Sequence, residues 1–184
     1  GGTAGGGAAG TSGGAAGGGA APAAGCGPAS TLAPADLHAA AAKTLLAPAM
    51  MSADMPNRCA FSSCHNTNRK VAMLDLGSAD GDLKALLVDR AACEAPNLKV
   101  VASGGGDDAL NKSWLWIKLT GAIDASNDLT VPATAATDWG TPGSCGQMGA
   151  SQYGARMPWG SANTLPEAQL ATVRDWICAG APGK

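Results

Sequence analysis

The chain lacks the features of proteins that act on nucleic acids or membranes. It has 12 basic and 14 acidic residues, which give a net charge of −2 at pH 7, and no basic block. Binding to nucleic acid or to an anionic membrane surface is therefore not expected. No apolar run approaches the roughly 18 residues that suggest a transmembrane helix, so no transmembrane segment is predicted.

Histidine and aromatic residues are also scarce. The 184 residues include two His, one Tyr, one Phe and five Trp. A Ser-His-Asp hydrolase would have to use His38, and no Gly-x-Ser-x-Gly elbow accompanies that histidine, so this class is not expected. The glycine run at 104–106 lacks the Lys-Ser/Thr of a phosphate-binding loop, and we interpret it as a turn. So few aromatic residues make a sparse core, which a large, flat apolar cofactor would complete.

The front of the chain is of low complexity, and the 27 glycines are concentrated there. Residues 1–27 contain only Gly, Ala, Thr, Ser, one Pro and one Cys. We predict a flexible tail or linker at 1–33, followed by one folded domain at 34–184. Such a linker would tether the domain to a surface, for instance behind a lipidated cysteine preceding Gly1. A homo-oligomer or filament formed through the glycine-rich tail is the open alternative.

One stretch indicates a specific chemistry: Cys59 and Cys64, with His65 directly after them. Two thiols and an adjacent imidazole are the arrangement that attaches a haem covalently, with the histidine bound to iron. The usual motif has two residues between the cysteines, whereas this one has four, and we expect the extra residues to loop outward. Two other interpretations stay open: a Cys59–Cys64 disulfide beside a surface histidine, and a zinc site completed from a distant segment.

Met157 is the candidate for a second axial ligand. A haem that transfers electrons commonly has a thioether sulfur opposite its histidine. Pro158 and Gly160 follow Met157 and predict a short, stiffened loop rather than a packed helix. A methionine buried in the core is the other interpretation. If Met157 is not the ligand, Met148 is the next candidate and His38 follows it.

Together with the haem segment, three ordered motifs give the region from Asp36 to Gly183 a family likeness. It resembles the single-haem bacterial c-type cytochromes (class I-like), and more narrowly a lipoprotein-like group within them. Its CX4CH spacing is similar to variant sites of some bacterial multihaem cytochromes. The resemblance implies a mainly α-helical, cytochrome c-like domain with long loops. The matching residues are Ser113-x-Leu115-x-x-Lys118-Leu119, Met157-Pro158 and Trp176-Ile177-x-x-Gly180-Ala181.

The resemblance also implies a function. One covalent haem c would be held by Cys59 and Cys64, with His65 and Met157 as axial ligands, in an electron carrier rather than an enzyme. The partners would be redox proteins. The six cysteines and the absence of an initiating Met suggest a processed, exported protein that is periplasmic, outer-surface or extracellular. The alternative is a haem-free, disulfide-rich surface or fibre-forming structural protein.

Four cysteines remain outside the haem segment, and they allow two disulfides in three pairings. In cytochromes of the class that the chain resembles, the first and last helices cross. That crossing would bring Cys26 near Cys178 and leave Cys93 to pair with Cys145. The second bond would close a loop of about 50 residues, worth on the order of 4 kcal/mol by chain entropy, and would anchor the stretch that leads to Met157.

Hydrophobic spacing and capping signals predict the helices. Three are expected at 34–51, 80–92 and 109–120, the third of them stopping at Gly121. Residues 122–150 show no clear period and are predicted to be a long surface loop.

The final helix has the clearest signals. Thr164-Leu-Pro-Glu167 is a capping box with Pro166 in the first turn, and Gly180 should end the helix. An apolar stripe should face the core, formed by Leu170, Val173 and Ile177 and widened by Trp176.

Overall fold

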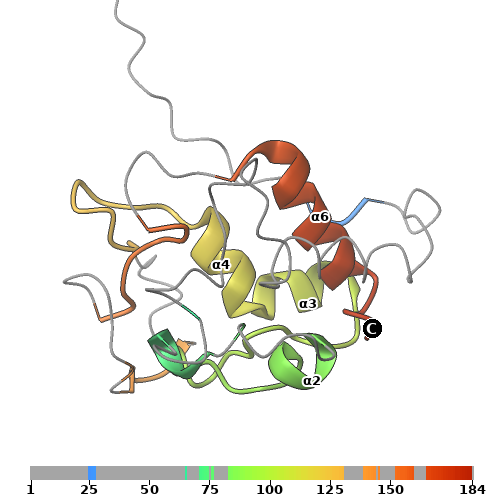
Figure 1. Ribbon diagram of the computed structural model, residues 1–184, viewed down its shortest axis with the longest axis horizontal. Helices are drawn as coiled ribbons and strands as arrows, with labels where there is room; N and C mark the ends of the chain where they lie inside the picture. The colour runs from blue at the N-terminus through green and yellow to red at the C-terminus, as the bar shows by residue number, and fades with distance from the viewer. Residues whose placement is uncertain are drawn as a thin grey trace, which may run out of the picture.

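The computed structural model describes residues 25–27, 65, 71–74, 76, 83–130, 139–143, 145, 152–159 and 165–183. Within them the chain forms short helices joined by turns and isolated β-bridges, without a β-strand, so this part is mainly α-helical (Figure 1). None of its helices is long and apolar enough to cross a membrane. The helix expected at 34–51 lies outside these residues. The helices are η2 (Val71–Met73, 3₁₀), α2 (Leu83–Leu87), α3 (Gly106–Lys112), α4 (Trp114–Thr120) and α6 (Glu167–Cys178).

The main core is built around α6, which packs against both α3 and α4 (Figure 1). Val173, Trp176 and Ile177 are completely buried, and Leu170 is partly buried against the same cluster. The indole nitrogen of Trp176 donates a hydrogen bond to the carbonyl oxygen of Pro182 at 3.0 Å, which satisfies a polar group inside the core. The predicted apolar stripe of the final helix is confirmed.

The two ends of α6 differ in how well the sequence predicted them. Pro166 is the N-cap residue, at φ −54° and ψ 148°, so the prediction that it lies inside the first turn is wrong. Its extended ψ keeps it out of the helix, and Thr164 lies outside the described residues. At the other end Gly180 has φ 87°, a left-handed conformation that glycine adopts without steric cost. The helix therefore stops where the sequence predicted.

The single helix predicted at 109–120 is two helices, separated at Ser113. This residue is extended, at φ −88° and ψ 110°. Its hydroxyl accepts a hydrogen bond from the Ala102 N–H at 2.9 Å and donates one to the Ala109 carbonyl at 2.7 Å. Such side chain–backbone bonds compete with helical ones, and here they turn the chain between α3 and α4. Gly121 follows α4 as predicted, although its backbone is extended rather than left-handed.

The helix predicted at 80–92 is also too long, because α2 ends at Leu87. Asp89 has φ 56°, which an aspartate tolerates but a helix does not. Its N–H donates to the Val101 carbonyl at 2.8 Å, and its carboxylate accepts from the Ser103 N–H at 3.0 Å. These bonds to a distant segment replace the helical ones and stop the helix.

The stretch at 122–150 is not simply a surface loop, although part of it lies outside the described residues. Residues 127–129 are buried, and so is Trp139. The Trp139 ring meets the rings of Trp114 and Tyr153 edge to face, with centroids 5.2 Å away in both cases. These rings form a second hydrophobic cluster. Aromatic packing of this kind needs no regular sequence period, which is why the prediction was wrong here.

Two disulfides join segments that are far apart in the sequence. Cys26 is bonded to Cys178 at the end of α6, with Cα atoms 5.7 Å apart, and Cys93 is bonded to Cys145, with Cα atoms 5.8 Å apart. These are the two pairs expected from the sequence. The backbone N–H of Cys26 also donates to the Asp107 carboxylate at 2.6 Å, which fixes this segment to α3 as well.

Candidate functional site

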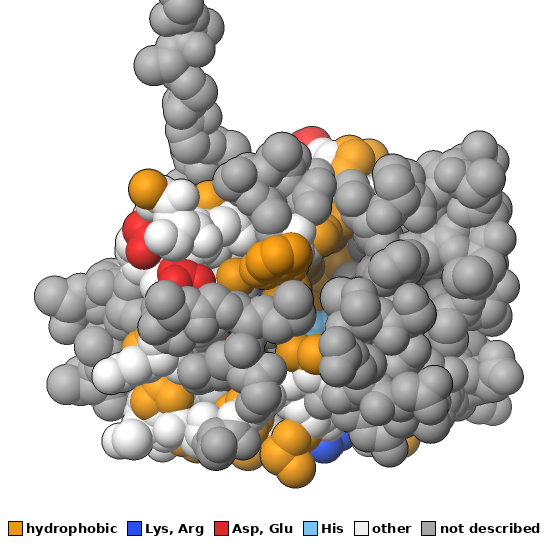
Figure 2. Space-filling model, turned by 60° about the vertical axis from the view of Figure 1, so that its left-hand side comes forward, with side chains coloured by type: hydrophobic (Ala, Val, Ile, Leu, Met, Phe, Trp, Pro, Cys, Tyr) orange, Lys and Arg blue, Asp and Glu red, His pale blue; other side chains and the backbone are white. Residues whose placement is uncertain are grey.

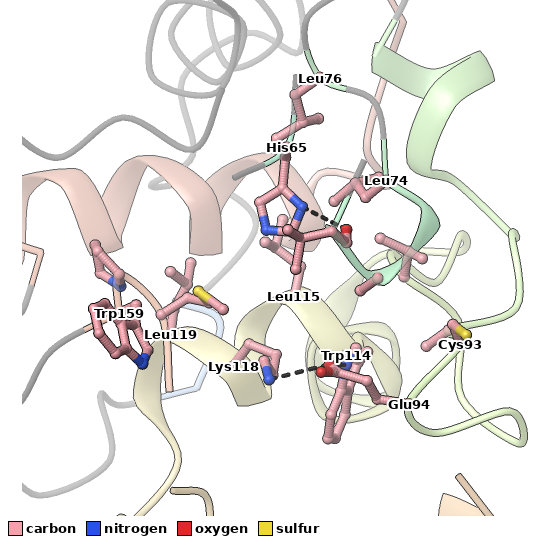
Figure 3. Close-up of a pocket in the computed structure, with 16 residues that line it drawn as sticks. His65, Leu74, Leu76, Cys93, Glu94, Trp114, Leu115, Lys118, Leu119 and Trp159 are labelled. Carbon is pink, nitrogen blue, oxygen red and sulfur yellow. Dashed lines mark hydrogen bonds and ion pairs between the residues drawn. The ribbon is translucent and has the colours of Figure 1, made fainter. Parts of the chain in front are cut away.

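A pocket with mainly apolar walls lies beside α4 (Figure 3). Its other walls come from η2, the segment at 92–94 and the loop at 157–159. In Figure 2 part of a histidine side chain is visible on one face of the molecule, next to hydrophobic side chains. The apolar lining includes Leu74, Leu76, Leu115, Leu119, Pro158 and Trp159.

His65 reaches this pocket with a defined tautomer. Its Nδ1 lies 2.8 Å from the carbonyl oxygen of Val71, and since a carbonyl can only accept, Nδ1 must carry the proton. The other ring nitrogen, Nε2, then carries a lone pair instead of a proton, and Figure 3 shows it on the other side of the ring from this hydrogen bond. Burial lowers the pKa of His65, against the opposing effect of the hydrogen bond to Val71. The imidazole is therefore neutral at pH 7 and able to bind a metal through Nε2.

The carbonyl that orients His65 belongs to a backbone turn in an unusual conformation. Ala72 and Met73 both have left-handed φ values, 54° and 59°, which are uncommon for residues other than glycine. Three hydrogen bonds hold the turn: Ala72 N–H to the Cys145 carbonyl at 3.0 Å, Arg90 to the Met73 carbonyl at 2.9 Å, and Leu74 N–H to the Val71 carbonyl at 3.1 Å. Strained backbone persists where the surroundings over-determine it, and such a turn presents the Val71 oxygen at a fixed place.

Met157 lines the same pocket, half-buried, on a loop that backbone hydrogen bonds fix to the rest of the domain. Its N–H donates to the Lys118 carbonyl at the end of α4, at 2.7 Å. The preceding residue, Arg156, donates its N–H to the Asn127 carbonyl at 3.0 Å. The structure thus brings His65 and Met157 to one pocket. Cys59 and Cys64, with the alternative ligands Met148 and His38, lie outside the described residues.

A buried ion pair in the pocket wall was not predicted from the sequence. The Lys118 Nζ lies 3.0 Å from the Glu94 carboxylate, and the two side chains are only 7% and 5% exposed. The same carboxylate oxygen accepts a hydrogen bond from the Trp114 indole at 3.0 Å, and Lys118 also donates to the Tyr153 carbonyl at 2.9 Å. Burial lowers the pKa of Lys118, and the Glu94 charge opposes that effect.

Sequence reasoning could have found only one half of this pair. Lys118 is the one charged side chain in the apolar run 114–119, and a lysine in such a run is buried only when an acid or a carbonyl accompanies it. Glu94 carries no comparable signal, because its neighbours follow neither helical nor strand periodicity. The role of the Val71 carbonyl as acceptor could not be predicted either, since every residue has a backbone carbonyl and the sequence does not distinguish this one.

The described residues of the pocket are of the types that a haem site uses. Apolar walls suit the flat porphyrin, a neutral imidazole with a free Nε2 suits the iron, and a thioether is available in the same pocket. Elsewhere in the described residues, no group of three or more His, Cys, Asp or Glu is placed to hold a metal ion. The ligand roles of His65 and Met157 remain predictions.

Comparisons with protein-family models, with curated proteins and with solved structures found no match for this chain. The pocket and the sequence motifs are therefore the observations from which a function can be inferred.

Proposed function

We propose that the chain is an electron-transfer c-type cytochrome with one covalently bound haem and a cytochrome c-like helical fold. Cys59 and Cys64 would hold the porphyrin, with His65 as the proximal ligand and Met157 as the distal ligand. The observation that carries the proposal is the pairing of two ligand types in one apolar pocket, where the Val71 carbonyl leaves Nε2 of the imidazole free. When bound, the haem would supply a one-electron iron couple.

The residues of the pocket would assist this chemistry in three ways. The Val71 carbonyl accepts the Nδ1–H and so makes the His65 imidazole a stronger electron donor at Nε2. The apolar walls would limit access of water to the haem, which would favour the less charged state of the iron and raise the potential. The Lys118 carbonyl fixes the backbone of Met157, so little rearrangement would accompany a change of oxidation state.

The rest of the assignment follows from the same proposal. The protein would be exported, in the periplasm, at the outer surface or outside the cell, where the two disulfides would be stable. Redox proteins would be its partners, and the residues at 1–33 would serve as a tether or in assembly. A second candidate is a haem-free structural protein, which the same two disulfides also favour. In that case His65 would be a buried histidine satisfied by Val71 alone.

Absorbance of the purified full chain separates the two candidates. The protein is produced in a host that exports it and attaches haem to a known c-type cytochrome, which serves as the positive control. A Soret band that survives acid–acetone extraction supports the cytochrome, and a double Cys59→Ala, Cys64→Ala variant should lose the band on extraction. His65→Ala removes the proposed proximal ligand. His38→Ala, at the other of the two histidines, is its matched control and should keep covalent haem. A colourless wild-type protein beside a loaded control cytochrome would exclude electron transfer through haem.

A further inference from the structure

One peptide group lies between the Cys93–Cys145 disulfide and the imidazole of His65. The carbonyl of this group is that of Val71, and its N–H is that of Ala72. The carbonyl accepts the His65 Nδ1–H at 2.8 Å, and the N–H donates to the Cys145 carbonyl at 3.0 Å. Because a peptide group is planar, its two ends cannot turn independently. Whatever holds the Ala72 N–H therefore helps to set the direction of the Val71 oxygen, which also accepts a hydrogen bond from the Leu74 N–H at 3.1 Å.

The acceptor for the Ala72 N–H is itself fixed by the disulfide. Cys145 is bonded to Cys93, whose carbonyl accepts a hydrogen bond from the Gly143 N–H at 3.1 Å. Cys93 also lies among the pocket residues, near Glu94 (Figure 3). The disulfide thus places the Cys145 carbonyl beside the turn that orients the imidazole.

The turn needs such a restraint. Ala72 and Met73 are both left-handed, and each non-glycine residue in this region adds on the order of 1 kcal/mol of strain or more. Without the hydrogen bond from the Ala72 N–H to the Cys145 carbonyl, the peptide group could rotate toward a more relaxed conformation. The Val71 oxygen would then turn away from His65. Hydrogen bonds at both ends of one peptide also polarise one another, which strengthens the bond to the imidazole.

We propose that the Cys93–Cys145 disulfide is a positioning bond for His65. It fixes the peptide between Val71 and Ala72, and so holds the imidazole in the tautomer and orientation that leave Nε2 free. The consequence of this positioning for iron rests on the proposed function, whereas the positioning itself concerns only the chain's own atoms. The bond would act on the histidine side of the pocket, in addition to restraining the stretch that leads to Met157.

The other disulfide provides a matched control. Cys26–Cys178 joins the segment at 25–27 to the end of α6, and neither cysteine lines the pocket. Removing either bond takes one cross-link from the unfolded chain. Only the removal of Cys93–Cys145 should alter His65 specifically.

The test is hydrogen exchange of the His65 Nδ1–H, followed by NMR in full-length protein labelled with ¹⁵N-histidine. His38→Gln assigns the signals, since the chain has two histidines. The reduced haem protein is used if haem is retained, and the haem-free chain otherwise, so loss of the proposed function leaves this test intact. Cys93→Ala with Cys145→Ala should exchange about fivefold faster or more, the factor for one ordinary hydrogen bond. Cys26→Ala with Cys178→Ala should exchange as wild type does.

Equal acceleration in both double variants, or none in the first, would overturn the proposal. If the first variant fails to fold, wild-type protein decides the question. In uniformly ¹⁵N-labelled wild-type protein the Ala72 N–H and the His65 Nδ1–H should open together, because the first belongs to the peptide group and the second is bonded to its carbonyl. Protection factors that differ by more than about tenfold, equivalent to loss of more than one ordinary hydrogen bond, would show that the two bonds are independent and that the disulfide does not position the imidazole.

Discussion

Replacing Lys118 by methionine removes the positive half of the buried ion pair and keeps nearly the same side-chain length. Glu94 would be left as a carboxylate that is 5% exposed, with the Trp114 indole as its remaining partner. The Tyr153 carbonyl would lose its donor as well. Breaking a buried pair on one side costs about 3–5 kcal/mol, a large fraction of the roughly 5–15 kcal/mol that stabilises a domain. We expect Lys118→Met to lower the free energy of unfolding by that amount.

Denaturant unfolding followed by far-UV circular dichroism measures the effect as a fall in the transition midpoint at constant slope. Lys112→Met is the matched control, because Lys112 pairs with Asp108 on the surface, with side chains 61% and 78% exposed. Such an exposed pair contributes at most about 0.5 kcal/mol.

A double variant tests the reasoning further. Adding Glu94→Gln to Lys118→Met removes the stranded charge and keeps an acceptor for the Trp114 indole. Only the Tyr153 carbonyl then remains without its partner, and the loss should shrink to about 1–3 kcal/mol. Two results would show that the stranded Glu94 charge does not cause the destabilisation. One is a loss below about 1 kcal/mol for Lys118→Met. The other is a double variant whose loss equals the sum of the losses of Lys118→Met and Glu94→Gln measured singly.

Three further predictions follow from other parts of the structure. If the chain carries the proposed haem, Met157→Ala should abolish the weak near-infrared charge-transfer band of the oxidised protein and keep the haem covalently bound; an unchanged band would assign the distal role to another residue. Ser113→Ala should lower the free energy of unfolding by about 1–3 kcal/mol, because the buried N–H of Ala102 loses its acceptor; chemical denaturation measures this, and a change near zero would contradict it. The hydrogen bond from the Ser103 N–H holds the pKa of Asp89 below its ordinary value of 3.8. Asp89 therefore stabilises the fold fully above pH 3.8, and this contribution disappears as the pH falls through the lower folded pKa. An NMR titration of its carboxyl should show the lowered pKa, and Asp89→Asn should remove this part of the acid sensitivity.

The parts of the fold that were predictable have strong local signals or few alternatives. The buried face of α6 follows from the spacing of Val173 and Ile177, and its end follows from Gly180. The disulfide pairs follow from a short list of cysteines once a helix crossing is assumed. His65 and Met157 belong to the sequence motifs themselves, and both line one pocket, while their ligand roles stay predictions.

The rest depends on contacts between distant segments, which have no local signature. Ser113 looks like an ordinary helix residue until the Ala102 N–H reaches its hydroxyl. Asp89 stops α2 because Val101 offers a carbonyl. Glu94 is buried because Lys118 and Trp114 meet it from another element. In each case long-range hydrogen bonds, or for Glu94 an ion pair and a hydrogen bond, outweigh a local preference of a few tenths of a kcal/mol.

The bond between Cys26 and Cys178 turns the covalent chain into a ring. Its two cysteines are 152 positions apart in sequence, so the ring contains nearly everything that follows the low-complexity tail. A protease that cuts the backbone once inside this ring opens it, but the two pieces stay joined and the mass changes only by one water. Release of a fragment needs a second cut or a reductant. A cut before Cys26, in contrast, removes the residues that precede it and leaves the ring closed. If the tail is the proposed tether, such a cut would release the domain without damage to the pocket.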